Sequence, residues 1–101
     1  MSSALAVSYG STMNVEGGTY NGAEAAAYVF SSGGTINLKS GEFKGGTKDL
    51  IASRTTGGEG MGTAVESHIY YSSSCTFTSS EPTTGGTIAS GYAGSIEQKE
   101  F

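Results

Sequence analysis

The sequence contains little of what usually stabilises a small domain. It has one cysteine, one proline and no tryptophan, and only 16 of its 101 residues are Leu, Ile, Val or Phe. A single cysteine excludes an intrachain disulfide, so the chain is not a disulfide-stapled secreted domain. No run of about 18 apolar residues occurs, which excludes a membrane-spanning helix. Disordered proteins are equally poor in apolar residues, but they also carry a high net charge, and the net charge here is only −4.

Basic residues are also scarce. Five Lys and Arg stand against nine Asp and Glu, and the pI is near 4.7. Because nucleic-acid binding requires a basic stripe or patch, and none is present, we expect no nucleic-acid partner. The N-terminus lacks the charged segment and long apolar core of a signal peptide. The chain is therefore expected to be cytoplasmic when made, or to be a mature or excised piece.

Glycine, serine and threonine are instead the three most abundant residue types, and Gly alone occurs 17 times. Glycine and β-branched threonine are poor helix formers, which argues against a helical bundle. Glycine and serine favour turns, whereas threonine suits strands. The composition predicts an all-β fold made of short strands and many turns.

The sequence repeats itself at an offset of 23, because residues 5–15 align with 28–38 and the match continues with 17–22 over 40–45. A third copy is predicted at an offset of 41, with Thr76 matching Thr35 and Phe77 matching Ile36, and residues 85–88 then match 17–20. The identical pairs of the first alignment are Ser8/Ser31, Gly10/Gly33, Thr12/Thr35 and Asn14/Asn37.

Each repeat is interpreted as three short strands separated by Gly and Ser turns. The first strand has the form of residues 12–15, and the second lies around Tyr20, Phe43 and Ile88. The third comprises residues 25–30, 49–53 and 92–96, with 5–8 as its N-terminal equivalent. Strand alternation predicts that Met13, Val15, Ile36, Leu38 and Phe77 face inward and that Thr12, Asn14, Thr35, Asn37, Thr76 and Thr78 face outward.

A period near 23 with three short strands fits one coil of a parallel β-helix, in which each coil buries its apolar side chains against its neighbours. We therefore predict a single β-solenoid domain over residues 1–101, with three to four coils and a Gly-rich insertion at 54–62. An antiparallel β-sandwich is the alternative, but it does not require residue types to recur at a fixed offset.

The segments at 17–22, 33–38 and 40–45 resemble the repeats of right-handed parallel β-helix proteins. Such repeats occur in the pectin-lyase-like superfold, in bacterial surface adhesins and in phage tail spikes. The resemblance spans residues 5–96 and implies a solenoid. It transfers no catalytic motif, because the clustered acids of the pectin-lyase-like enzymes have no counterpart here.

Three to four coils are close to the minimum for a stable solenoid, and each end exposes a strand edge. The charged tail 97–101 is suited to blunting one end, whereas residues 1–6 are not suited to protecting the other. We therefore expect copies to associate, either end to end as a filament or side by side as a trimer. A fragment of a longer β-helix and a capped monomer remain as alternatives.

Catalytic and metal-binding residues are sparse. Asp49, Arg54 and His68 are the only residues of their types, and Cys75 is expected to be a small buried hydrophobe. Because a metal site needs more ligands and glycoside hydrolysis needs two facing carboxylates, we predict no enzyme, no metal and no cofactor.

Outward aromatic residues and the insertion are the candidates for binding. Tyr70 and Tyr71 cannot share one face of a strand, so one of them is expected to point outward, where tyrosine suits a glycan or a protein interface. The candidate ligand or interface residues are Tyr70, Tyr71, Arg54, Glu59 and Met61. The sequence thus predicts a non-enzymatic, self-associating subunit of an extracellular fibre, surface layer or viral spike, with a carbohydrate-binding or adhesin module as the alternative.

Overall fold

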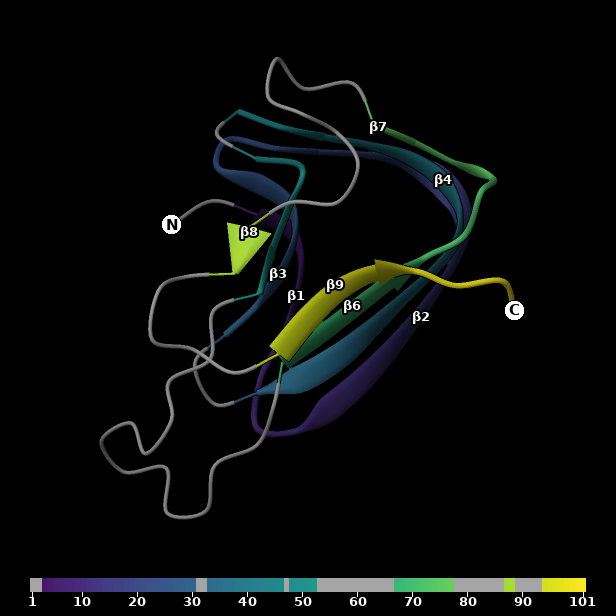
Figure 1. Ribbon diagram of the computed structural model, residues 1–101. Helices are drawn as coiled ribbons and strands as arrows, with labels where there is room; N and C mark the ends of the chain where they lie inside the picture. Colours follow the sequence, from purple (N-terminus) through teal and green to yellow (C-terminus); the bar gives the residue numbers. More distant parts are fainter. Residues whose placement is uncertain (1–2, 31–32, 47, 53–66, 78–86, 89–93) are drawn as a thin grey trace.

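The computed structural model describes residues 3–30, 33–46, 48–52, 67–77, 87–88 and 94–101 (Figure 1). These residues form strands and turns, and no helix occurs among them. In this part of the chain, nothing helical is therefore long or apolar enough to cross a membrane. The strands are β1 (Ser3–Val7), β2 (Ser11–Gly22), β3 (Ala25–Val29), β4 (Gly34–Gly45), β5 (Leu50–Ala52), β6 (Ser67–Tyr71), β7 (Cys75–Phe77), β8 (Thr87–Ile88) and β9 (Gly94–Gln98).

The strands form two sheets in which every pair that the structure describes is parallel. One sheet has the order β1-β3-β5-β8, and the other has the order β2-β4-β6-β9, with β7 also pairing with β4. The chain passes repeatedly from the first sheet to the second, so each passage adds strands to both (Figure 1). The protein is therefore all-β with parallel sheets, and the antiparallel alternative is wrong.

The register of β2 against β4 confirms the first repeat and its offset. Thr12 pairs with Thr35, and Asn14 pairs with Asn37. Met13, which lies between Thr12 and Asn14, pairs with Ile36 at the same offset. Identical side chains therefore meet on neighbouring strands.

The third repeat begins at a different offset from the predicted one. Thr35 pairs with His68, an offset of 33, and not with Thr76. Thr76 instead pairs with Glu42, and Phe77 pairs with Phe43. The predicted offset of 41 is wrong because it matched serines and threonines, which are common throughout this chain. The structural register follows the inward-facing apolar residues.

Two short strands also belong to different sheets from those predicted. β8 was expected to align with the strand around Tyr20, but it pairs with β5 in the first sheet. The segment 92–96 was expected to continue the row of β3 and β5, whereas β9 pairs with β6 in the second sheet. Both errors follow from the wrong offset of the third repeat.

The first and second strands of a repeat were predicted to be separate, but in β2 and β4 they form one strand of 12 residues. Each of these strands is irregular in its middle, where the register shifts between Val15 and Thr19. Gly17, Gly18 and Gly41 lie there with φ between 103° and 132°, a range that L side chains rarely adopt. In the third repeat the same irregularity separates β6 from β7.

The core lies between the two sheets and consists of columns of stacked side chains. Ile36, Leu38, Phe43 and Ile69 are fully buried in it. Tyr20, Phe43 and Phe77 form an aromatic column with ring centroids 5.4 and 5.9 Å apart. The predicted inward positions Met13, Val15, Ile36, Leu38 and Phe77 all belong to this core or pack against it. Of the predicted outward positions, Thr12, Asn14 and Thr76 are exposed, Thr35 and Asn37 are half-buried, and Thr78 lies outside the described residues.

Candidate functional site

In the part of the chain that the structure describes, each sheet ends on both sides in a strand with one unpaired edge. β2 and β9 are the outer strands of the second sheet, and β1 and β8 are the outer strands of the first. An outer strand has backbone N–H and C=O groups that no neighbour in its sheet satisfies, and it is therefore a template for pairing with another chain. We call β1 and β2 the N-terminal edge, and β8 and β9 the C-terminal edge.

Burial along one core column decreases toward both edges. The column consists of Met13, Ile36, Ile69 and Ile96, one residue from each strand of the second sheet. Ile36 and Ile69 are 0% exposed, whereas Met13 and Ile96 are only half-buried. The apolar column thus ends at a surface on each side.

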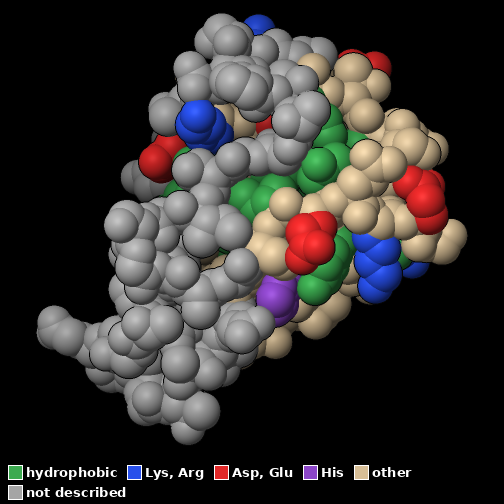
Figure 2. Space-filling view, in the orientation of Figure 1, with side chains coloured by type: hydrophobic (Ala, Val, Ile, Leu, Met, Phe, Trp, Pro, Cys, Tyr) green, Lys and Arg blue, Asp and Glu red, His purple; other side chains and the backbone are tan. Residues whose placement is uncertain are grey.

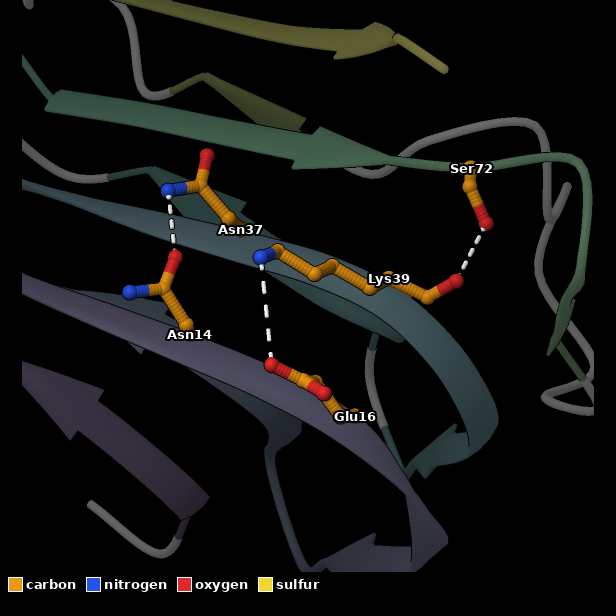
Figure 3. A network of polar contacts seen from close by, with 5 residues as sticks. All are labelled: Asn14, Glu16, Asn37, Lys39 and Ser72. Atoms are coloured by element: carbon orange, nitrogen blue, oxygen red, sulfur yellow. Dashed lines mark hydrogen bonds and ion pairs between the residues drawn. The ribbon is translucent and has the colours of Figure 1, made fainter. Parts of the chain in front are cut away.

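A row of polar side chains crosses from β2 to β4 on the outer face of the second sheet. Asn37 Nδ2 donates to Asn14 Oδ1 at 2.9 Å (Figure 3). Two positions further along, Lys39 Nζ lies 3.8 Å from Glu16 Oε2 (Figure 3). Both contacts link residues that share the offset of the first repeat. They show that a polar ladder repeats across the outer face.

The same face continues over β6 and β9 with an aromatic group. Tyr70 lies in register with Asn37 on one side and Glu97 on the other. Its ring stacks on the His68 ring, with centroids 5.6 Å apart, and Lys99 Nζ lies 5.0 Å from its centroid. An aromatic ring, an amide, a carboxylate and an ammonium group thus adjoin one another.

The C-terminal residues fold against the turn that follows β6. Glu100 accepts hydrogen bonds from the Ser73 backbone N–H at 3.0 Å and from the Ser73 hydroxyl at 3.2 Å. Phe101 is 52% exposed, although Lys39 Nζ and Lys99 Nζ lie 5.8 and 5.5 Å from its ring centroid. The tail therefore lies against this turn, and no strand of the described part of the chain pairs with the outer edge of β9.

An open cleft of about 420 Å³ lies over β7. Tyr71, Phe77 and Gln98 contribute side chains to its wall, together with the Ser72–Cys75 turn. Burial raises the pKa of the Cys75 thiol above its ordinary value of 9.0. Figure 2 shows apolar side chains (green) that reach the surface in the middle of the view, among polar ones. Cys75 is half-buried here and packs against the core, close to its expected role as a small hydrophobe.

Asp49 is the one buried carboxylate among the described residues. The residue is only 1% exposed, and its Oδ1 accepts a hydrogen bond from the Gly45 N–H at 2.9 Å. Oδ2 is buried without a hydrogen-bond partner. Leu50 pairs with Ala27 of β3. Asp49, one residue before Leu50, therefore corresponds to Ala26 of the preceding repeat.

The structure separates the predicted site residues. Tyr70 lies on the outer face, whereas Tyr71 packs edge-on against Phe77 at a centroid distance of 5.2 Å and belongs to the core margin. The expectation that only one of the two tyrosines faces outward is thus confirmed. Arg54, Glu59 and Met61 lie outside the described residues. The described residues contain no group of three or more His, Cys, Asp or Glu that could hold a metal ion.

Sequence reasoning missed the charged members of the outer face. Glu16, Lys39 and Lys99 were not among the predicted interface residues, yet Glu16 and Lys39 form part of the polar ladder and Lys99 lies beside Tyr70. A signal was present for one pair, because Glu16 and Lys39 are separated by the offset of the first repeat. No such signal exists for Lys99, whose placement depends on the register of β9.

The comparisons with known proteins add no relative: no protein-family model, curated protein or solved structure matches this chain.

Proposed function

We propose that the protein is a short parallel β-helix that acts as a non-enzymatic, self-associating structural subunit. The fold proposal rests on the alternation between two parallel sheets. It also rests on the chain separation of paired strands, which lies between 22 residues (Ser3 beside Ala25) and 36 residues (Ile51 beside Thr87). A chain that winds in successive coils produces this alternation, with each strand beside its counterpart in the preceding coil.

Self-association rests on one observation, the open strand edges at both ends of an apolar column. Met13 and Ile96 end that column half-buried, although the two residues between them are fully buried. A second copy that paired with either edge would bury the end residue and satisfy the backbone groups of the outer strand. An end-to-end contact that does not close gives a filament. A fibre, a surface layer or a spike outside the cell or on a virus particle suits such a subunit.

Size-exclusion chromatography with light scattering, over a series of protein concentrations, tests this proposal. We expect masses at multiples of the 10.2 kDa chain that increase with concentration. Electron microscopy of the same samples distinguishes a filament from a closed trimer. A monodisperse 10.2 kDa monomer at every concentration would overturn the proposal.

Glycan binding is a second candidate, favoured by the surroundings of Tyr70. Sugar rings stack on aromatic side chains, and their hydroxyls bond to amides and carboxylates such as those of Asn37 and Glu97. On a glycan array we expect hits with the wild type that Tyr70→Ala abolishes. Tyr28→Ala is the matched control, because Tyr28 is a half-buried tyrosine of the other sheet. An array without hits would remove this candidate.

A further inference from the structure

We infer that the N-terminal edge of one copy docks on the C-terminal edge of another, with β2 pairing on β9 and Glu16 placed beside Lys99. The inference rests on the proposed self-association and specifies its partner and its register. The partner is a second copy of the chain, and the contact is heterologous, because two different edges meet.

The edges have matching steps. The first sheet begins with β1 and ends with β8, and the second begins with β2 and ends with β9. In the chain β1 directly precedes β2, and β8 directly precedes β9. A second copy that places its β2 on β9 therefore brings its β1 to β8. Both sheets then continue through the junction.

The side-chain columns continue in this register. Ile96 of one copy meets Met13 of the second copy, so the two half-buried ends of the apolar column cover each other. On the outer face, Ser95 meets the second copy's Thr12, as His68 meets Thr35 within the chain. Gln98 would meet the second copy's Val15. At this position a polar side chain would therefore lie beside an apolar one.

The charges at the junction are complementary. Glu16 directly follows Val15 in β2, and Lys99 directly follows Gln98, the last residue of β9. Within the chain, Lys39 follows Leu38 in β4, the strand after β2, and forms an ion pair with Glu16 at 3.8 Å (Figure 3). At the junction Lys99 would lie on the other side of the second copy's Glu16 from that copy's own Lys39, because β9 would precede this β2 whereas β4 follows it. Opposite charges at this position fix the register and the direction of docking.

Tyr9 adds a second feature to the N-terminal edge. It lies in the turn between β1 and β2, is 82% exposed and has a φ of 54°. A bulky residue with a left-handed backbone is strained, and strain of this kind is concentrated at functional sites. An exposed tyrosine beside an open strand edge is also typical of an interface residue.

Charge reversal tests the junction. Glu16→Lys and Lys99→Glu each place like charges at it, and each is expected to raise the concentration needed for assembly by at least about tenfold. The double variant, and an equimolar mixture of the two single variants, restore opposite charges and are expected to assemble like the wild type. Glu42→Lys is the matched control, because Glu42 is an exposed acid on β4, away from both edges.

Each variant is first checked for its free energy of unfolding, since Glu16→Lys also removes the exposed ion pair with Lys39. Tyr9→Gly gives an independent readout: it relieves the strained backbone, so we expect equal or higher stability but weaker assembly. If the wild type assembles and Lys99→Glu assembles equally well, the junction is wrong and the proposed function stands. If the wild type stays monomeric, both are wrong.

Discussion

The side chains of Asn14 and Asn37, on adjacent parallel strands, are joined by a hydrogen bond of 2.9 Å. We expect Asn37→Ala to lower the free energy of unfolding by about 1 kcal/mol, because one net hydrogen bond is lost on a partly exposed surface. Urea denaturation measures the change. Asn21→Ala, at an exposed asparagine of β2, is the control and is expected to have little effect. Equal losses from the two variants would show that the ladder contributes nothing.

Neighbouring positions of β4 are expected to differ strongly in their tolerance of charge. Ile36→Asp places a carboxylate at a position that is 0% exposed, and we expect it to prevent folding. Thr35→Asp places the same group on the outer face beside His68, and its effect is expected to stay within about 1 kcal/mol. Circular dichroism and urea denaturation measure both. A loss of folding in both variants would contradict the inward and outward assignment.

Asp49 is expected to reduce stability through its unpaired oxygen. Asp49→Asn keeps an oxygen that accepts from the Gly45 N–H and replaces the unpartnered carboxylate oxygen by an uncharged amide group, so we expect the free energy of unfolding to rise by about 1 kcal/mol. Asp49→Ala leaves that N–H without its acceptor and is expected to be less stable than Asp49→Asn. Urea midpoints at one pH rank the three proteins. A less stable asparagine variant would contradict the explanation.

The Cys75 thiol is expected to make stability depend on pH in the alkaline range. Burial raises its pKa in the folded protein above 9.0, so the unfolded chain loses the proton first as the pH rises. The stability associated with this shift is complete below the unfolded pKa and is lost as the pH rises through the folded one. Urea unfolding between about pH 7 and pH 10 measures the decline, which Cys75→Ala should reduce. Identical profiles for the two proteins would refute this prediction.

The first two repeats could be predicted from the sequence because their similarity includes both faces of the strand. Met13 and Ile36 match inside, and Asn14 and Asn37 match outside. In the third repeat only the inside is preserved, since Ile69 stacks on Ile36 whereas Tyr70 lies beside Asn37. Outward residues are free to vary, so identical serines and threonines were a poor guide to register. The inward apolar positions would have given the correct offset.

The candidate site was only partly predictable for a related reason. Tyr70 and Tyr71 were both candidates, and alternation predicted that one of them faces outward without saying which. The edge positions of Met13 and Ile96, and the approach of Lys99 to Tyr70, depend on which strands lie at the ends of the sheet. This order follows from pairing over long sequence distances, which a single chain's composition and alternation do not specify.

The spacing of partner strands along the chain determines the entropic cost of bringing them together. Among the described residues, each strand from β3 onward pairs with a strand that lies between 22 and 36 residues earlier in the chain. The longer connection between β4 and β6, with an offset of 33 instead of 23, adds only about 0.3 kcal/mol of closure entropy. A longer connection between two paired strands therefore adds little to the entropic cost of closing the loop.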